Sequence, residues 1–167
     1  MSDGTVQNTP GYPIEKLYQA YFYAMLAAQA LENCIDNSLN IEKIDPSNPP
    51  TEAEARLMLA QNPNTLGKRV YAVRDVEAEV HKLFPTLQPL IQRRNDLAHS
   101  FVYEAALIIK SDFSAVQGIV NDLDQAQEDF LAATKQVQLA NLDRLLEKMN
   151  LTPDQVTDYE QLKQACQ

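Results

Sequence analysis

The chain is poor in several features that mark whole classes of protein. It has four glycines, and none stands in a phosphate-cradling loop, which argues against mononucleotide and dinucleotide folds. No GxSxG or HExxH string occurs, so two common hydrolase signatures are missing. The two cysteines, Cys34 and Cys166, form neither a CxxC pair nor a Cys/His ligand spacing and are expected to be incidental thiols. The sequence therefore predicts no metal site and no cofactor.

Long hydrophobic runs are also missing. No stretch approaches the ~20 apolar residues that a membrane span needs, and the N-terminus lacks the basic-then-apolar pattern of a secretory signal. We therefore expect a soluble, cytoplasmic protein without a membrane partner. A chain of 167 residues with 45% hydrophobic content can bury one sizeable core. This predicts one domain over residues 13–167, preceded by a polar, flexible tail over residues 1–12.

Net positive charge is missing as well. The formal charge of −9 argues against a general nucleic-acid binder, because Lys and Arg contacts to phosphate dominate such affinity. Residues 65–99, however, hold more basic than acidic side chains. Four of these bases are candidate substrate-binding residues on a local basic groove: Lys68, Arg69, Arg74 and Arg93. A solvated helix face is the alternative interpretation of the same charges.

What the chain has in abundance is helical periodicity. Apolar residues recur at spacings of three and four, and no alternating run indicates a strand. The pattern predicts a long helix from residue 13 to about 39, a short helix over 51–62 opened by a Thr51/Glu54 capping box, and further helices over 66–84, 86–109, 112–149 and 152–162. Phe84-Pro85 is expected to end the third of these helices. The expected fold class is all-α, a bundle of four main helices with short extra helices.

The helix expected over 86–109 contains an unusual polar group within its apolar pattern, the sequence Arg94-Asn95-Asp96-Leu97-Ala98-His99. At ~100° per residue, Asn95 and His99 lie on nearly one face, one turn apart. Arg94 projects ~140° round the helix from His99. Its long side chain must therefore reach round the helix, or across to another chain, to act together with that histidine.

These residues resemble the arginine, polar residue, spacer and histidine motif of the higher eukaryotes and prokaryotes nucleotide-binding (HEPN) superfamily. The resemblance extends over roughly residues 13–150, and includes the Thr65-Leu66-Gly67-Lys68 helix opening, the break near Phe84 and the long helix after the motif. It implies an HEPN-like helical bundle that dimerises through the motif helix. In active members of the superfamily it also implies a metal-independent endoribonuclease.

The chemistry of the motif residues fits that implication. The imidazole of His99 can accept or return a proton near neutral pH, as cleavage at a ribose 2'-hydroxyl requires. Arg94 can hold the scissile phosphate and stabilise transition-state charge, and Asn95 can orient the histidine ring. One chain supplies only one such histidine, whereas a two-fold dimer supplies an acid and a base.

Two interpretations of function follow. The first is a metal-independent endoribonuclease of the toxin or defence type, with a composite Arg/His site at a homodimer interface. Its partners would be a second copy, RNA, and a cognate antitoxin or regulatory protein. The second is a non-catalytic helical dimerisation or interaction module, in which the polar residues form a hydrogen-bonded network that fixes the register of a helix seam.

Overall fold

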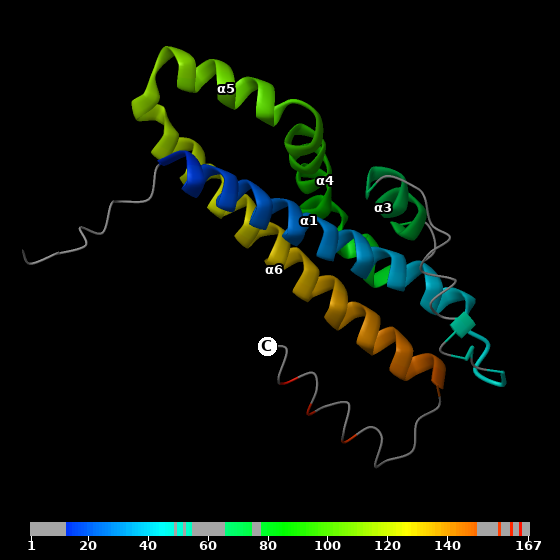
Figure 1. Ribbon diagram of the computed structural model, residues 1–167. Coiled ribbons are helices and arrows are strands. Elements are labelled where there is room, and N and C mark those ends of the chain that lie inside the picture. Colours follow the sequence, from blue (N-terminus) through cyan, green and yellow to red (C-terminus); the bar gives the residue numbers. More distant parts are fainter. Residues whose placement is uncertain are drawn as a thin grey trace, which may run out of the picture.

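The fold is built from helices throughout the part of the chain that the structure describes. The computed structural model describes residues 13–48, 50, 51, 53, 54, 66–74, 78–149, 157, 161 and 164. It contains the helices α1 (Pro13–Lys43), α3 (Leu66–Arg74), α4 (Ala78–His99), α5 (Phe101–Ser111) and α6 (Val116–Met149), and the short 3-10 helix η1 (Phe113–Ala115) (Figure 1). These residues include no strand, which confirms the all-α prediction.

The two longest helices, α1 and α6, lie side by side and run in the same direction (Figure 1). Buried polar groups join them: the Asn141 amide donates to the Cys34 carbonyl at 2.9 Å, and the Ser38 hydroxyl donates to Asn141 Oδ1 at 2.6 Å. Further along, Lys148 Nζ donates to the Glu42 carbonyl at the end of α1 at 2.9 Å. A slip of one helix along the other would leave these groups buried and unpaired, so they fix its register.

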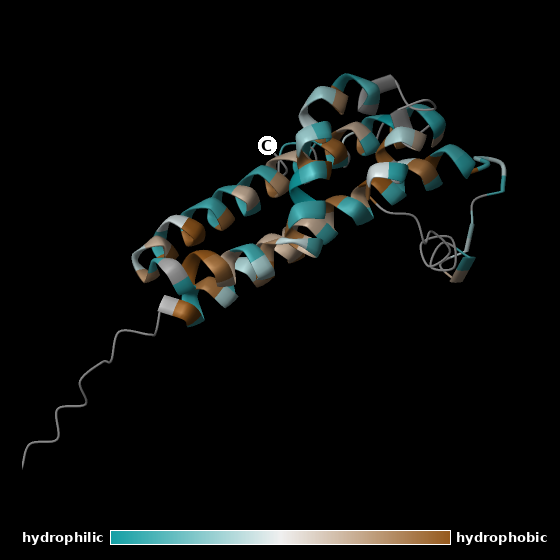
Figure 2. Ribbon diagram, turned by 90° about the horizontal axis from the view of Figure 1, so that it is seen from above, coloured by the Kyte–Doolittle hydropathy of each residue, from teal (hydrophilic) through white to brown (hydrophobic). Residues whose placement is uncertain are grey.

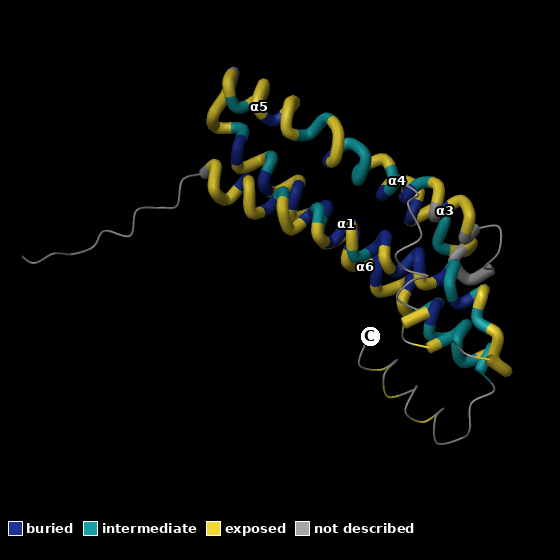
Figure 3. The backbone as a smooth tube through the Cα atoms, turned by 45° about the vertical axis from the view of Figure 1, so that its right-hand side comes forward, coloured by how far each residue is buried: buried dark blue, intermediate teal, exposed yellow. Residues whose placement is uncertain are grey.

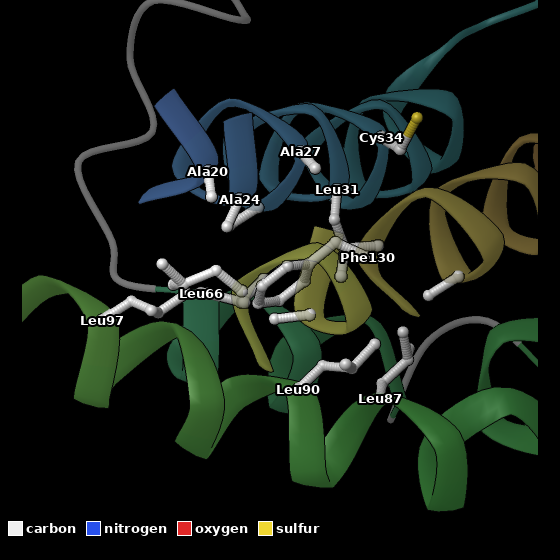
Figure 4. Close-up of a cluster of buried hydrophobic side chains, with 14 of the residues drawn as sticks. Ala20, Ala24, Ala27, Leu31, Cys34, Leu66, Leu87, Leu90, Leu97 and Phe130 are labelled. Carbon is white, nitrogen blue, oxygen red and sulfur yellow. The ribbon is translucent and has the colours of Figure 1, made fainter. Parts of the chain in front are cut away.

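The core lies where this helix pair meets α3 and α4 (Figure 4). The buried face of α1 includes four alanines, whose small side chains allow the neighbouring helices to approach closely: Ala20, Ala24, Ala27 and Ala28. The Phe130 ring of α6, which is fully buried, fills the space between Leu31 of α1 and the leucines of α4 (Figure 4). The other labelled members of this cluster are Ala20, Ala24, Ala27, Cys34, Leu66, Leu87, Leu90 and Leu97.

The short helix α3 packs against both α1 and α4. Its residues Leu66 and Val70 are buried one turn apart, and Gly67 lies against Ile91 of α4. A Cβ atom at position 67 would stand 3.2 Å from Ile91 Cγ2, closer than a comfortable carbon contact. Gly67 therefore allows α3 to approach the helix that carries the Arg/His motif.

The prediction that a helix ends at Phe84-Pro85 is wrong. The helix expected over 66–84 is divided between α3 and α4, and α4 continues through Pro85 and Pro89 to His99. A proline inside a helix removes a backbone donor and costs roughly 3 kcal/mol. The side chains of Leu87 and Leu90 are buried on the same stretch. Each burial stabilises the folded state by about 1.5–3 kcal/mol. Tertiary packing thus overrides the local preference.

The continuous helix expected over 86–109 is also wrong, because α4 and α5 meet at a corner (Figure 1). The corner residue, Ser100, has φ −115°, well away from the helical value. Its backbone N–H and its hydroxyl both donate to the Asp96 carbonyl, at 3.0 and 3.2 Å. Serine side chains of this kind compete for helix carbonyls and bend helices. Leu97, Phe101 and Ala105 keep a spacing of four across Ser100, so the apolar pattern of the sequence continues through the corner and does not predict the helix break.

Two predicted helix starts can be checked directly. For the helix expected over 112–149, Asp112 accepts a hydrogen bond from the Ser114 backbone N–H at 2.9 Å; it caps the 3-10 helix η1, which leads into α6. The Thr51/Glu54 capping box is formed, with Glu54 Oε2 accepting from the Thr51 N–H at 2.8 Å. The tail over 1–12, most of the helix expected over 51–62, and the helix expected over 152–162, apart from positions 157 and 161, lie outside the described residues.

The C-terminal end of the α1–α6 pair carries an ion pair that makes stability depend on pH. Arg144 Nε lies 2.8 Å from Glu42 Oε1, and this hydrogen bond, with help from the Lys148 charge, holds the pKa of Glu42 below its usual value of 4.5. A carboxyl group with a lowered pKa in the folded state stabilises the protein above the unfolded-state pKa. That contribution disappears as the pH falls through the folded-state pKa.

We therefore expect Glu42→Gln to lower the free energy of unfolding by about 0.5–1.5 kcal/mol at pH 7. The difference from the parent should shrink as the pH falls below about 4.5, because the parent's own carboxyl becomes protonated there. Urea titrations between pH 7 and pH 3 measure this difference. The matched control is Glu104→Gln on the exposed face of α5, and a Glu42→Gln deficit that stays constant over the whole range would contradict the assignment.

Candidate functional site

The three motif residues occupy the last turns of α4. His99 is the final residue of the helix and is exposed, whereas Arg94 and Asn95 are half-buried. Within the described residues, the Asn95 amide makes no hydrogen bond to the His99 ring, so the structure does not show the orienting contact considered for it. Asp96 accepts a hydrogen bond from Gln92 Nε2 at 2.7 Å and pairs with neither Arg93 nor His99.

Arg94 is held by an acid from another helix of the same chain. Its Nε donates to Glu32 Oε1 of α1 at 2.6 Å, and the two side chains are 21% and 6% exposed. Gln29 Nε2 donates to the other carboxylate oxygen of Glu32 at 3.4 Å. The two terminal nitrogens of the Arg94 guanidinium make no hydrogen bond to any described residue, so they are available to an anionic ligand.

The α4–α5 corner beside His99 is anchored to α1 by one aromatic side chain. The Tyr21 hydroxyl donates to the Leu97 carbonyl at 3.0 Å. The Tyr21 ring stacks on the Phe101 ring, with centroids 5.0 Å apart and an interplanar angle of 8°. His99 and Ser100 lie between these two contact points in the sequence. The histidine backbone is therefore positioned from α1, as Arg94 is.

Of the four candidate substrate-binding residues, the two whose side chains the structure describes, Lys68 and Arg93, lie on different helices. Lys68 is exposed on α3, and Arg69 and Arg74 belong to the same helix, although their side chains are not among those described. Arg93 points to the α4–α6 side, where an Nη donates to the Asp122 carbonyl at 3.1 Å. There it lines a groove of about 660 Å³ that also contains the carboxylates Asp122 and Asp129. Arg93 thus lies among acids, which is an unfavourable setting for RNA phosphate.

Sequence reasoning missed Glu32 and the anchoring role of Tyr21. A signal for Glu32 was present, since this acid falls on the buried stripe of α1 next to Leu31 and four residues after Ala28. A carboxylate on a buried face requires a partner, so it points to a basic residue elsewhere in the fold. The basic residue that pairs with Glu32 depends on how α4 packs against α1. Hydrophobic periodicity does not predict that packing.

Comparisons of the chain with protein-family models, with curated proteins and with solved structures find no match. The HEPN resemblance thus depends on the motif residues and their helical setting. Among the residues that the structure describes, no three side chains of the His, Cys, Asp and Glu types are grouped as metal ligands. None of the described helices is both long enough and apolar enough to cross a bilayer.

The Arg94–Glu32 contact leads to a stability prediction. Glu32→Gln keeps the size of the side chain but leaves the half-buried Arg94 charge without its counter-ion. We expect the free energy of unfolding to fall by about 1–3 kcal/mol, as for other partly buried pairs that lose one member. Equilibrium urea unfolding at pH 7 measures the change. Glu15→Gln, at an exposed position in the first turn of the same helix, should cost only about 0.5 kcal/mol through the helix dipole, and an equal loss in both variants would argue against the pair.

Proposed function

We propose that this chain is an HEPN-like, metal-independent endoribonuclease of the toxin or defence type, which acts in the cytoplasm and whose site is completed by a second copy. One observation carries the proposal. Glu32 binds the Nε of Arg94 and leaves both terminal guanidinium nitrogens open, while the exposed His99 ends the same helix. This arrangement offers a fixed cation and a titratable group on one helix end, as cleavage of a phosphodiester requires.

The chemistry assigned to these residues balances without a metal. One His99 removes the proton of a ribose 2'-hydroxyl, and the 2'-oxygen forms a bond to phosphorus. The bond from phosphorus to the 5'-oxygen breaks, and the His99 of the second copy supplies the proton that this leaving oxygen needs. Arg94 stabilises the charge that gathers on the non-bridging oxygens. The products are a 2',3'-cyclic phosphate and a free 5'-hydroxyl.

Substrate binding depends on few positive charges in this proposal. Lys68, which is exposed on α3, is one of the bases that would bind RNA phosphate. Arg69 and Arg74 follow it on the same helix. Because the chain as a whole carries −9 and few bases are available, RNA binding should be weak, and with so few phosphate contacts it should fall only gradually with added salt. In a cell, such an enzyme requires restraint by a cognate antitoxin or another regulatory protein.

Single-stranded RNA incubated with the full chain in excess EDTA tests the proposal. We expect cleavage in the presence of the chelator, with fragments that carry 2',3'-cyclic phosphate ends, read by mass spectrometry. Cleavage that requires added Mg²⁺ or Mn²⁺, or fragments with 5'-phosphate ends, would contradict the mechanism. Failure to cleave any of a panel of structured and unstructured RNAs would contradict the activity itself.

The second candidate function is a non-catalytic dimerisation or interaction module. The Arg94–Glu32 ion pair, which joins α1 to α4 within one chain, favours a structural role for the motif arginine over a catalytic one. If this is the role of the motif, substitution of Arg94 should lower the melting temperature or dissociate the dimer. The parent protein should then cleave no RNA.

A further inference from the structure

The N-terminal half of α1 and the whole of α5 together expose an unusual number of large apolar side chains. Tyr18 of α1 is 68% exposed, and Val102 of α5 is 64% exposed. We call the set the α1–α5 surface; its members are Ile14, Tyr18, Phe22 and Leu26 on α1, and Val102, Tyr103 and Leu107 on α5. The four α1 residues are spaced by four and so form one stripe along the helix. Large exposed apolar side chains gathered on two neighbouring helices are typical of an interaction site.

The two halves of this surface flank a groove. A hollow of about 380 Å³ lies between α1 and α5, and both Tyr18 and Val102 line it. Its other lining residues are mostly apolar and include Ala105, Ala106 and Ile109. Exposed residues dominate α5 in Figure 3, and hydrophobic segments gather in Figure 2 at the end of the molecule where α1 begins. The groove can thus accept side chains from another helix.

Charge indicates what can cover this surface. Residues 14–26 carry one acid and one base, Glu15 and Lys16, and α5 likewise carries only Glu104 and Lys110. By contrast, α6 carries six acids and three bases, and the whole chain carries −9. Two copies of so acidic a chain repel one another at most orientations, and least where their surfaces are neutral. The α1–α5 surface is such a place.

The chain's own first residues are poorly suited to cover it. Residues 1–12 include three hydrophobic side chains, Met1, Val6 and Tyr12, among mostly small and polar ones. They offer far less apolar area than the seven large side chains of the α1–α5 surface expose. A second copy offers the same seven, and in a two-fold interface each patch faces itself.

We propose that the α1–α5 surface binds the same surface of a second copy of this chain. The inference rests on the proposed function in one respect, because that function requires two His99 residues at one site. His99 precedes Val102 by three residues, and the corner between them is anchored to Tyr21, midway along the α1 stripe. A two-fold axis near this corner brings the two histidines towards each other, and the interface completes the site.

Analytical ultracentrifugation of the full chain tests the interface without RNA. We expect a dimer at micromolar concentration. The double variant Tyr18→Asp/Val102→Asp places four like charges at the two-fold contact and should weaken dimerisation at least ~100-fold. Both positions are exposed, so the helical circular dichroism spectrum should not change. The matched control is Leu131→Asp, because Leu131 is a large exposed apolar residue on α6, and it should leave the dimer intact.

A parent protein that remains monomeric at 100 μM overturns the interface, and so does a dimer that the double variant leaves unchanged. RNA cleavage is measured separately on the same samples, so the two proposals fail in different ways. A dimer that the double variant dissociates but that cleaves no RNA keeps the interface and rejects the nuclease. A parent that cleaves RNA as a monomer rejects the interface, and it also rejects the two-histidine mechanism while keeping ribonuclease activity.

Discussion

Replacing His99 with alanine is expected to lower the rate of RNA cleavage by at least ~100-fold, the usual cost of losing a general acid–base group. His99 is exposed at the end of α4, so its removal should leave the folded structure and the dimer unchanged. Initial rates on a fluorescent RNA, measured in EDTA across pH 5 to 9, give the effect. The parent should show a bell-shaped profile, because one imidazole must be neutral and its partner protonated.

His81 provides the matched control, since it is the other histidine of the chain and is also exposed on α4. His81→Ala should cleave RNA at the parental rate. Arg94→Ala should also lose at least ~100-fold, because it removes the charge that stabilises the transition state. Since this variant also removes the ion pair between Arg94 and the buried Glu32, its melting temperature must be recorded beside its rate. Parental cleavage by His99→Ala, with an intact fold, would remove the histidine from the mechanism.

Replacing Phe130 with alanine is expected to lower the free energy of unfolding by about 3–5 kcal/mol, a large share of the stability of a small domain. The Phe130 ring is fully buried between α1 and α4, so its removal leaves a cavity in the core (Figure 4). Urea unfolding followed by circular dichroism measures the loss. Leu131→Ala, at the next and 46% exposed position, should cost less than about 1 kcal/mol. Equal losses at the two positions would contradict this description of the core.

Hydrophobic periodicity was sufficient to predict that these segments are helices, because it reports which face of each helix is buried. It did not predict where α4 begins and ends. At Pro85 the burial of Leu87 outweighs the cost of the proline, and at Ser100 the apolar spacing continues through a change of direction. At Pro85 the decisive energy comes from the distant residues against which Leu87 packs. At Ser100 it comes from local hydrogen bonds to Asp96, which an apolar pattern does not report.

The candidate site, like the fold, could be predicted from the sequence only in part. The types and spacing of Arg94 and His99 could be recognised in the sequence, since they carry distinctive chemistry. The partner of Arg94 could not, because Glu32 lies 62 residues earlier and meets it only through the packing of α1 on α4. Of the four candidate substrate-binding bases, the one on α4, Arg93, contacts the α6 backbone at Asp122 instead of lying beside Arg94.

The parallel arrangement of α1 and α6 has a consequence for how the protein is made. The hydrogen bond between Asn141 and Cys34 joins residues 107 apart, and the buried face of α1 has to wait for α6 before it can be covered. At typical rates of synthesis of ~5–20 residues per second, that wait lasts about 5–20 s on the ribosome. During this interval the face of α1 that packs on α6 is exposed to chaperones, and a chain interrupted before α6 leaves that face uncovered even though Glu32 can already pair with Arg94 of α4.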